Sequence, residues 1–489
     1  MAKFTFEKMP RLIFLTPQEV ERVHEEALKV LENVGVYFDS EEALKILEEA
    51  GCKVDKEKKI VKFPPSLVVE SIEAAPETIA IFDRDGEFYA ELGNNTNYFD
   101  PGSAAIRVLL DDGITVRDST SADMKAVVKI TDFLSQIDFQ TTALVCSDIP
   151  YEVGDLYRLY LVMKESKKPV TAGAFSVPGV RWMRELLKAV RDSYDEVEKK
   201  PYAIFTICPS PPLKWTHISA QNIIDCARFG LPIEFISMSM LGAASPATII
   251  GSVVQDVAET LSGLTLAQVV RKGIPVIYGG APVVFDMRTG TTPMSAVEAV
   301  MISCVCAQVA KYYGLPTHTY AALSDAKIVD AQAGFETALS GILAALAGIN
   351  VISGAGILDF VGTFSLEKLV IDAEVIGMIK RVTRGILVNE ETLAAELFQQ
   401  VGPGGDFLST KHTRHWFKKE QYFVGPVVDR KDRAAWEQEG SKDIFRRARE
   451  QVKAILQSHP GTPLSQEKEH SLEAALLAVA KEAGVEVPV

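Results

Sequence analysis

From about residue 97 onward, short apolar runs alternate with amphipathic helical segments. Eight runs stand out, and each is followed by enough chain for a helix and two loops. They span residues 97–99, 139–146, 170–175, 202–207, 233–238, 276–278, 317–322 and 350–354. Strands that are apolar on both faces and alternate with helices predict a parallel sheet. Eight such repeats favour an α/β fold of the (β/α)8 type, a TIM barrel, over an open doubly wound sheet.

Signals for a nucleotide-binding open sheet are missing. No GxGxxG follows a predicted strand, and the chain has no GxxxxGK[ST] motif. The sequence therefore favours the closed arrangement, in which chemistry lies where the strands end.

The flanking regions have a different pattern. Residues 1–95 predict a mainly helical cap with some β structure, including a helix that begins at Thr16-Pro17 and a second one capped by Asp39. Residues 96–384 form the predicted barrel. Residues 385–489 form a C-terminal extension, with a glycine-rich loop at 401–407, a charged helix over about 431–455 and a terminal helix.

Composition narrows the class of protein. The chain of 489 residues has a formal net charge of −14 and no basic cluster, which argues against nucleic acid and anionic membranes as partners. Its six cysteines are scattered, which predicts reduced thiols in a cytoplasmic protein and no metal centre. The chain has no uninterrupted apolar run of about 18 residues, so we predict no membrane span. We expect the chain to self-associate.

Polar and aromatic residues gather where the predicted strands end. Aromatic faces hold alkylammonium ions, at roughly 0.5–2 kcal/mol per contact, because a quaternary nitrogen has no N–H to donate. Any one of these aromatics could equally be a core residue. Likewise, His318 could be a satisfied interior histidine, Asp325 a helix cap and Arg288 a surface arginine. The candidates are Tyr98, Phe99, Asp100, Tyr278, Arg288, His318, Tyr320, Asp325, Lys327 and Phe360.

One block resembles a known family. Ser324-Asp325-Ala326-Lys327, followed by residues 330–336, is similar to a block typical of the trimethylamine methyltransferase family. Segments 98–102, 279–282 and 402–408 support the resemblance, which covers almost the whole chain. It implies a (β/α)8 barrel that moves a methyl group from an amine nitrogen to the cobalt of a corrinoid carried on a separate small protein. It also implies that no cofactor is tightly bound to this chain.

The resemblance narrows the substrate. Founding members of the family act on trimethylamine and contain pyrrolysine, which this chain lacks. Members without pyrrolysine are associated with quaternary amines such as glycine betaine, proline betaine or carnitine. A betaine-type amine is therefore the expected substrate, and the sequence does not select among betaines.

The positions of the candidates at the ends of predicted strands suggest their roles. We expect Tyr98, Phe99, Tyr278, Tyr320 and Phe360 to surround the cation. Arg288 and His318 are expected to bind a substrate carboxylate, Asp100 and Asp325 to balance the ammonium charge or orient His318, and Lys327 to frame the substrate.

Three alternatives stay open at this point. The chain could act on a tertiary amine. It could be a pterin-dependent barrel methyltransferase, with Asp100, Asn350 and Asp359 as pterin-binding groups. It could also be a non-catalytic betaine-binding protein on an enzyme fold.

Overall fold

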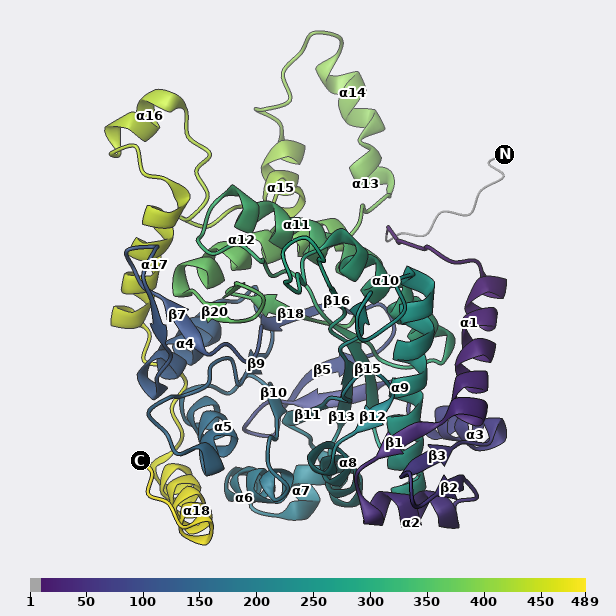
Figure 1. The fold of residues 1–489 in the computed structure, drawn as a ribbon. Helices are drawn as coiled ribbons and strands as arrows, with labels where there is room; N and C mark the ends of the chain where they lie inside the picture. Colours follow the sequence, from purple (N-terminus) through teal and green to yellow (C-terminus); the bar gives the residue numbers. More distant parts are fainter. Residues whose placement is uncertain (1–9) are drawn as a thin grey trace.

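Eight parallel strands form the centre of the protein, in a computed structural model that describes residues 10–489 (Figure 1). Each of the eight predicted runs overlaps one of these strands. Five lie in the order β15–β13–β11–β10–β9, and three in the order β17–β18–β6. The strands are β6 (Tyr98–Pro101), β9 (Gln140–Thr141), β10 (Val170–Gly173), β11 (Ala203–Ile207), β13 (Ile233–Ser237), β15 (Val276–Gly280), β17 (His318–Tyr320) and β18 (Val351–Ala355).

Hydrogen bonds join the two parallel sheets at both of their edges. Between β15 and β17, the Tyr278 N–H donates to the Pro316 carbonyl at 2.9 Å, and Tyr278 forms a parallel bridge with Thr317. Between β6 and the chain entering β9, the N–H groups of Asp138 and Phe139 donate to the Phe99 carbonyl at 2.7 and 3.2 Å. Each of the eight strands therefore has a neighbour on both sides.

Helices cover the outside of the strands. Each of the eight helices that follow the strands packs on the next one, and the last, α12, packs on the first, α4. They are α4 (Ser121–Phe133), α5 (Gly154–Glu165), α6 (Gly179–Arg191), α8 (His217–Phe229), α9 (Ile249–Val270), α10 (Val297–Tyr312), α11 (Ala331–Leu346) and α12 (Leu366–Thr383). The predicted α/β class with parallel strands is confirmed.

The strands are buried on both faces, as their composition predicts. In β13 every residue is buried. Phe235 points outward to α9, where a Cβ on Gly263 would lie 2.8 Å from its ring. Because successive side chains of a strand point to opposite faces, Glu234 points inward. The inner face thus carries a carboxyl group that the outer, apolar face does not.

A hairpin closes the amino-terminal end of the strands. β4 (Ile79–Phe82) and β5 (Phe88–Leu92) are antiparallel. Their apolar residues form a cluster with Phe139, Ile204, Ile277 and Val351, which lie on or next to the parallel strands. Water is thereby excluded from this end, and the opposite end is left for a site.

The N-terminal segment packs on the outside of α9. Helix α1 (Pro17–Lys29) begins at Thr16, whose side chain accepts a hydrogen bond from the Glu19 N–H, as predicted. The predicted cap of α2 (Glu41–Glu49) was wrong by one residue: Ser40, not Asp39, accepts from the Ala43 N–H at 3.2 Å. The other elements here are a π-helical turn (Val30–Val34), β1 (Val36–Phe38), β2 (Lys53–Asp55), β3 (Ile60–Lys62) and α3 (Pro65–Ala74).

The N-terminal sheet includes a strand from later in the chain. β12 (Lys214–Trp215), which follows β11, pairs in parallel with β1. The remaining short elements are β7 (Arg107–Leu109), β8 (Val116–Asp118), a 3-10 turn (Tyr151–Val153), α7 (Tyr194–Lys199), β14 (Met240–Leu241), β16 (Val283–Val284), β19 (Ile357–Leu358) and β20 (Thr363–Phe364).

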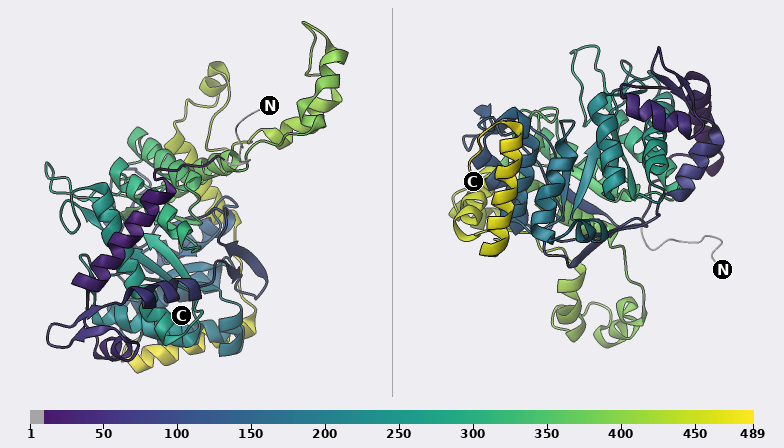
Figure 2. Two further views of the ribbon diagram at one scale, coloured as in Figure 1. Left: turned by 90° about the vertical axis from the view of Figure 1, so that its right-hand side faces the viewer. Right: turned by 90° about the horizontal axis from the view of Figure 1, so that it is seen from below.

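The C-terminal segment first leaves the body and then returns to it. Helices α13 (Glu390–Leu393), α14 (Ala395–Val401) and α15 (Lys411–Glu420) make a projecting arm (Figure 2). The charged helix predicted over 431–455 is in fact two helices, α16 (Arg433–Gln438) and α17 (Ile444–Ser458), separated at Gly440, which has a φ of 92°. Helix α17 lies against α12 and α4, and α18 (Gln466–Ala483) against α5 and α6.

Candidate active site

A cavity of about 1170 Å³ lies at the carboxyl ends of the parallel strands. Residues that end or follow each of the eight strands line it, among them Ser103, Val145, Phe175, Thr206, Met238, Ala281, Tyr320 and Phe360. The wall is mostly apolar. The structure thus places this cavity where a fold of this type carries its chemistry.

Glu234 lies just beneath the floor of this cavity. Its Oε2 accepts a hydrogen bond at 2.8 Å from Thr206, a residue of the cavity wall. Its Oε1 is buried and has no hydrogen-bond partner among the described residues. Burial raises the pKa of Glu234 from 4.5 to about 8, although the Thr206 bond opposes this. At neutral pH the carboxyl is therefore mainly protonated, and an approaching cation would favour its ionisation.

His318 faces the same carboxyl group. Its Nδ1 lies 3.8 Å from Glu234 Oε1, and its Nε2 is 2.7 Å from Ser353 Oγ. Burial lowers the pKa of His318 to about 3, so the imidazole is neutral. A neutral ring does not supply the positive charge expected of a carboxylate-binding histidine. Gly279 makes room for it, because a Cβ there would lie 3.2 Å from Nδ1 and 2.4 Å from Ile236 Cδ1.

Asp100 is the second carboxyl group inside the ring of strands. It is fully buried on β6, and its Oδ2 accepts from Thr171 Oγ1 at 3.2 Å. Burial raises its pKa well above the ordinary value, and the nearby Glu234 raises it further. The structure therefore brings Asp100, Glu234 and His318 together as buried polar groups below the cavity.

Two of the five predicted cage aromatics line the cavity, Tyr320 and Phe360. Tyr320 donates from its hydroxyl to the Ser103 carbonyl at 2.7 Å, and its ring meets His318 edge-on at 5.4 Å. Phe360 already carries a protein cation, because Lys327 Nζ lies 3.7 Å from its ring centroid. Of these two aromatics, Tyr320 is therefore the better placed to contact a bound cation.

The other three predicted cage aromatics lie away from the cavity. Tyr98 stacks on Phe139 in the cluster at the amino-terminal end. Phe99 is fully buried and faces Lys380 of α12. The Tyr278 hydroxyl donates at 2.8 Å to Asp256 on α9, behind the strands. A residue at the end of a strand can still point outward to the helices or lie below the cavity. The sequence pattern does not distinguish these cases.

The predicted charged residues are also dispersed. The Arg288 side chain is 88% exposed and pairs with Asp286 of its own loop at 2.8 Å. Asp325 accepts hydrogen bonds from the N–H groups of Met294 and Ser295, so it holds the loop that follows β16. Lys327 pairs with Asp359 at 3.3 Å. None of these three borders the cavity.

Sequence reasoning missed two residues of the site. Glu234 is a carboxylate in the middle of the apolar run Ile233-Glu234-Phe235-Ile236, and that break in the pattern was a usable signal. Arg158 lies on α5 and lines the cavity with only 3% exposure. It had no such signal, because a helical arginine is ordinarily a surface residue.

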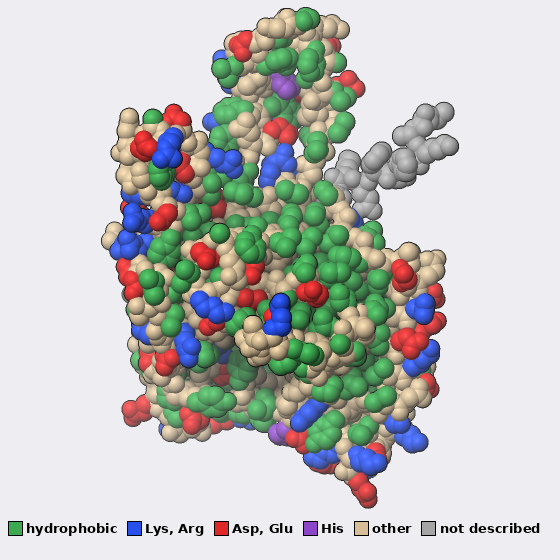
Figure 3. All heavy atoms as spheres, turned by 45° about the horizontal axis from the view of Figure 1, so that its top comes forward, with side chains coloured by type: hydrophobic (Ala, Val, Ile, Leu, Met, Phe, Trp, Pro, Cys, Tyr) green, Lys and Arg blue, Asp and Glu red, His purple; other side chains and the backbone are tan. Residues whose placement is uncertain are grey.

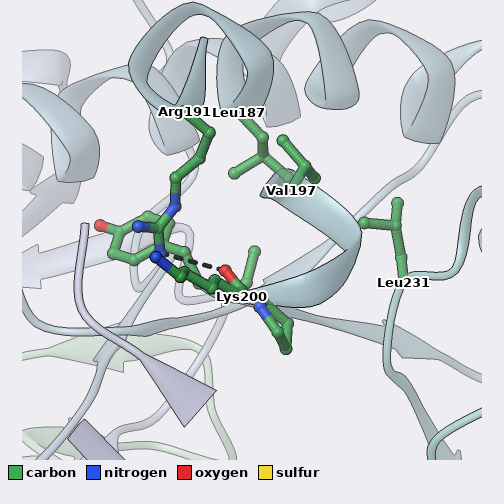
Figure 4. Close-up of a pocket in the computed structure, with 8 residues that line it drawn as sticks. Leu187, Arg191, Val197, Lys200 and Leu231 are labelled. Atoms are coloured by element: carbon green, nitrogen blue, oxygen red, sulfur yellow. Dashed lines mark hydrogen bonds between the residues drawn. The ribbon is translucent and has the colours of Figure 1, made fainter. Parts of the chain in front are cut away.

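Other described pockets and clusters offer less. A small cleft between α6, α7 and β11 is lined by Leu187, Arg191, Val197, Lys200 and Leu231 (Figure 4). There the buried Arg191 donates to the carbonyls of Asp83 and Lys200, so the cleft serves packing. Within residues 10–489, no group of three or more His, Cys, Asp or Glu is arranged to hold a metal ion.

A cavity with buried carboxyl groups at the carboxyl ends of parallel strands is the arrangement of an α/β enzyme. Comparison with known proteins gives its family. The family model for trimethylamine methyltransferase (MTTB) matches residues 1–484. The chain is 34% identical over 460 residues to trimethylamine methyltransferase MttB of Methanosarcina thermophila, covering 93% of this chain and 94% of that protein. The chain belongs to the trimethylamine methyltransferase family, and the predicted resemblance is confirmed.

Two further likenesses add to this. The glycine betaine methyltransferase of Desulfitobacterium hafniense is 30% identical over 480 residues, covering 98% of this chain and 99% of that protein. The crystal structure of the monomethylamine methyltransferase MtmB of Methanosarcina barkeri superposes with a TM-score of 0.55 at 13% identity, covering 98% of this chain and 90% of that one. That second likeness bears on the fold alone.

Proposed function

We propose that this methyltransferase moves a methyl group from a quaternary, betaine-type amine to the Co(I) corrinoid of a separate corrinoid-binding protein. Family membership over nearly the whole chain supports the reaction class. The glycine betaine methyltransferase relative, together with the lack of pyrrolysine in the sequence, supports a quaternary amine over trimethylamine.

The proposed architecture is a closed (β/α)8 barrel over residues 96–384. A mainly helical cap (1–95) and a C-terminal extension (385–489) flank it. Support comes from the hydrogen bonds at both edges of the two parallel sheets and from the continuous ring of helices outside them. In this arrangement the cavity is the mouth of the barrel.

The chemistry requires little from acids or bases. The bond between nitrogen and one methyl carbon breaks, the bonding electron pair stays on nitrogen, and a neutral tertiary amine leaves without taking up a proton. A bound corrinoid supplies the nucleophile, Co(I). The chain's task is to orient one N–CH3 bond toward the mouth and to exclude water, and positioning of this kind accounts for up to about 7–11 kcal/mol of a barrier.

The floor of the cavity suits the ammonium group. Tyr320 supplies an aromatic face, and Glu234 lies one hydrogen bond below the wall at Thr206. A cation on this floor would draw Glu234 toward its ionised form, which then balances the charge. Asp100 is less suited to this task, because burial raises its pKa and an ionised Glu234 raises it further.

The rim of the cavity suits a corrinoid face. Exposed apolar side chains surround the opening, with Tyr151 85%, Phe175 53% and Met238 42% exposed. Figure 3 shows a face of this molecule on which hydrophobic side chains gather around a hollow. An apolar rim of this kind can cover a flat macrocycle and keep water from the transfer.

Two further proposals concern the setting of the protein. The free cysteines, five of them buried and one partly buried, support a cytoplasmic location. Exposed apolar residues on the projecting arm, among them Leu393, Phe398 and Leu408, support self-association. Separately, no described helix is long and apolar enough to cross a membrane.

The observation that carries the proposal is the cavity at the strand ends with its buried, protonatable Glu234. The test mixes the protein, a Co(I) corrinoid and a panel of methylated amines, and follows the visible spectrum of the corrinoid. We expect methylation with glycine betaine or a related betaine and none with trimethylamine. Tight betaine binding without corrinoid methylation by any quaternary amine would instead indicate a binding protein.

A further inference from the structure

Arg158 is a buried cation in the cavity wall. It lies on α5, and its side chain reaches the chain that follows β9, where Nη1 donates to the Thr142 carbonyl at 3.1 Å. Nε donates to the Gly154 carbonyl at 3.3 Å. Among the described residues no hydrogen bond involves Nη2, and no carboxylate oxygen lies within 4.0 Å of the guanidinium nitrogens.

A buried arginine without an anionic partner is costly. The guanidinium stays charged at any physiological pH. Removing it from water costs roughly several kcal/mol unless a nearby anion compensates its charge. Burial lowers the pKa of Arg158 and the charge of Asp155 opposes this, but Asp155 makes no ion pair with it: its two oxygens accept from the N–H groups of Leu156 and Phe175 at 2.8 and 2.7 Å. The protein therefore leaves the Arg158 charge for something that enters the cavity.

The cavity combines this cation with carboxyl groups that can ionise. Arg158 sits in its wall beside Phe175, whose ring centroid is 5.4 Å from the guanidinium carbon. Tyr320 lies within electrostatic range of Arg158 and also of Glu234 and Asp100. A zwitterion with a carboxylate and a quaternary ammonium would therefore find a group of opposite charge for each end once Glu234 ionises.

We propose that Arg158 binds the substrate carboxylate and thereby selects quaternary amines that carry a carboxylate over quaternary amines whose other substituents are uncharged. This inference rests on the proposed function for the identity of the cationic end. Arg158 thus takes the carboxylate-binding role expected of Arg288, which is exposed and paired within its own loop. Because a planar guanidinium can offer two N–H groups to one carboxylate, the contact also fixes which way the ammonium end points.

The test compares two ligands that share a trimethylammonium group. Glycine betaine has the carboxylate, and choline has a hydroxyl in its place. Binding is measured by calorimetry with no corrinoid present, so no methyl transfer takes part. We expect Arg158→Gln to weaken glycine betaine by roughly 10- to 100-fold, the range for a lost charged hydrogen bond, and choline by less than about threefold. Arg158→Lys keeps the positive charge but lacks the paired N–H donors of the guanidinium, so its loss of glycine betaine affinity should fall in between.

Arg191→Gln is the matched control. Arg191 is also a buried arginine that donates to two backbone carbonyls, and it lies in the cleft of Figure 4, away from the cavity. Its loss should lower the melting temperature and leave the betaine-to-choline affinity ratio unchanged. Circular dichroism of every variant separates loss of binding from loss of folding.

The outcomes are distinguishable. Equal losses for both ligands in Arg158→Gln, or wild-type betaine affinity in that variant, would overturn the role of Arg158. A wild-type protein that binds no carboxylated quaternary amine would overturn it as well. Selective betaine binding through Arg158, without any corrinoid methylation, would refute the proposed function and leave this inference standing.

Discussion

At the scale of single residues, the proposed site includes an acid that we expect to stay protonated until its ligand arrives. Glu234 has its pKa raised to about 8 by burial, so below that pH the free protein holds a proton there. A bound quaternary cation stabilises the carboxylate and lowers this pKa in the complex. Binding below pH 8 therefore releases a proton, and linkage requires the affinity to rise with pH.

This gives a pH prediction. Glycine betaine affinity should increase from pH 6 to about pH 8, by at most about tenfold per pH unit, and then level off. Glu234→Gln should bind more weakly at pH 8 and show a flat profile. His318, with a pKa of about 3, stays neutral throughout and does not contribute. Calorimetry in buffers of different ionisation enthalpy measures the proton release directly, and a flat wild-type profile would contradict the role of Glu234.

Sequence alone predicted part of this site. It identified Asp100, His318, Tyr320 and Phe360, because the strand-end rule finds residues near the mouth. The rule does not say toward which face a side chain points, so it also selected Tyr278, which bonds Asp256 behind the strands. It selected Arg288 from its position after a strand and did not consider Arg158, because the burial of a helical arginine depends on the tertiary packing.

At the scale of elements, a buried ion pair ties the end of β18 to α12. Lys368 Nζ lies 2.5 Å from Asp372 Oδ2, and both side chains are at most 2% exposed. The same carboxylate accepts from the Gly356 N–H at 2.8 Å, and Lys368 donates to Thr337 of α11. The pair thus fixes the turn that leads to Phe360 at the cavity.

Removing one partner of this buried ion pair should destabilise the protein. Asp372→Ala leaves Lys368 buried without its counter-charge, and we expect a loss of about 3–5 kcal/mol in the free energy of unfolding. Asp195→Ala is the matched control, because Asp195 and Lys199 form an exposed i,i+4 pair, and it should cost less than about 0.5 kcal/mol. Urea unfolding compares the two, and similar losses would exclude the structural role of the buried pair.

Strand positions were predictable, but strand lengths were not. The run 139–146 predicted a long strand, whereas β9 covers only Gln140–Thr141. Beyond it the chain remains beside β6 through a bridge between Ala105 and Leu144, and then lines the cavity at Val145 and Cys146. Apolar character therefore continues past the strand because the cavity wall, as well as the core, is apolar.

At the scale of the whole molecule, the two ends of the strands differ in purpose. The amino-terminal end is plugged by the β4–β5 hairpin, and the carboxyl-terminal end is open with an apolar rim. A partner can therefore reach the site from one side only. The projecting arm is a separate surface with exposed apolar residues. The sequence pattern placed it in an extension outside the barrel but did not show that it would project.

The rim can be tested with a charge. Tyr151→Glu places a carboxylate among apolar groups at the opening, and it should raise KM for the corrinoid protein by roughly tenfold, because a charge is expensive to bury in an apolar interface. Betaine binding measured alone should not change. Phe88→Glu is the control, since Phe88 is 63% exposed on the hairpin at the opposite end. Equal effects of the two variants on KM would argue against docking at the rim.

If the methyl group leaves a betaine nitrogen for a corrinoid, a label on that methyl group must arrive on the cobalt. The most direct measurement supplies glycine betaine with deuterated N-methyl groups to the protein and a Co(I) corrinoid, and follows label by mass spectrometry. We expect one labelled methyl on the corrinoid for each dimethylglycine formed. Betaine consumed without label reaching the corrinoid, or no consumption despite tight binding, would contradict the account.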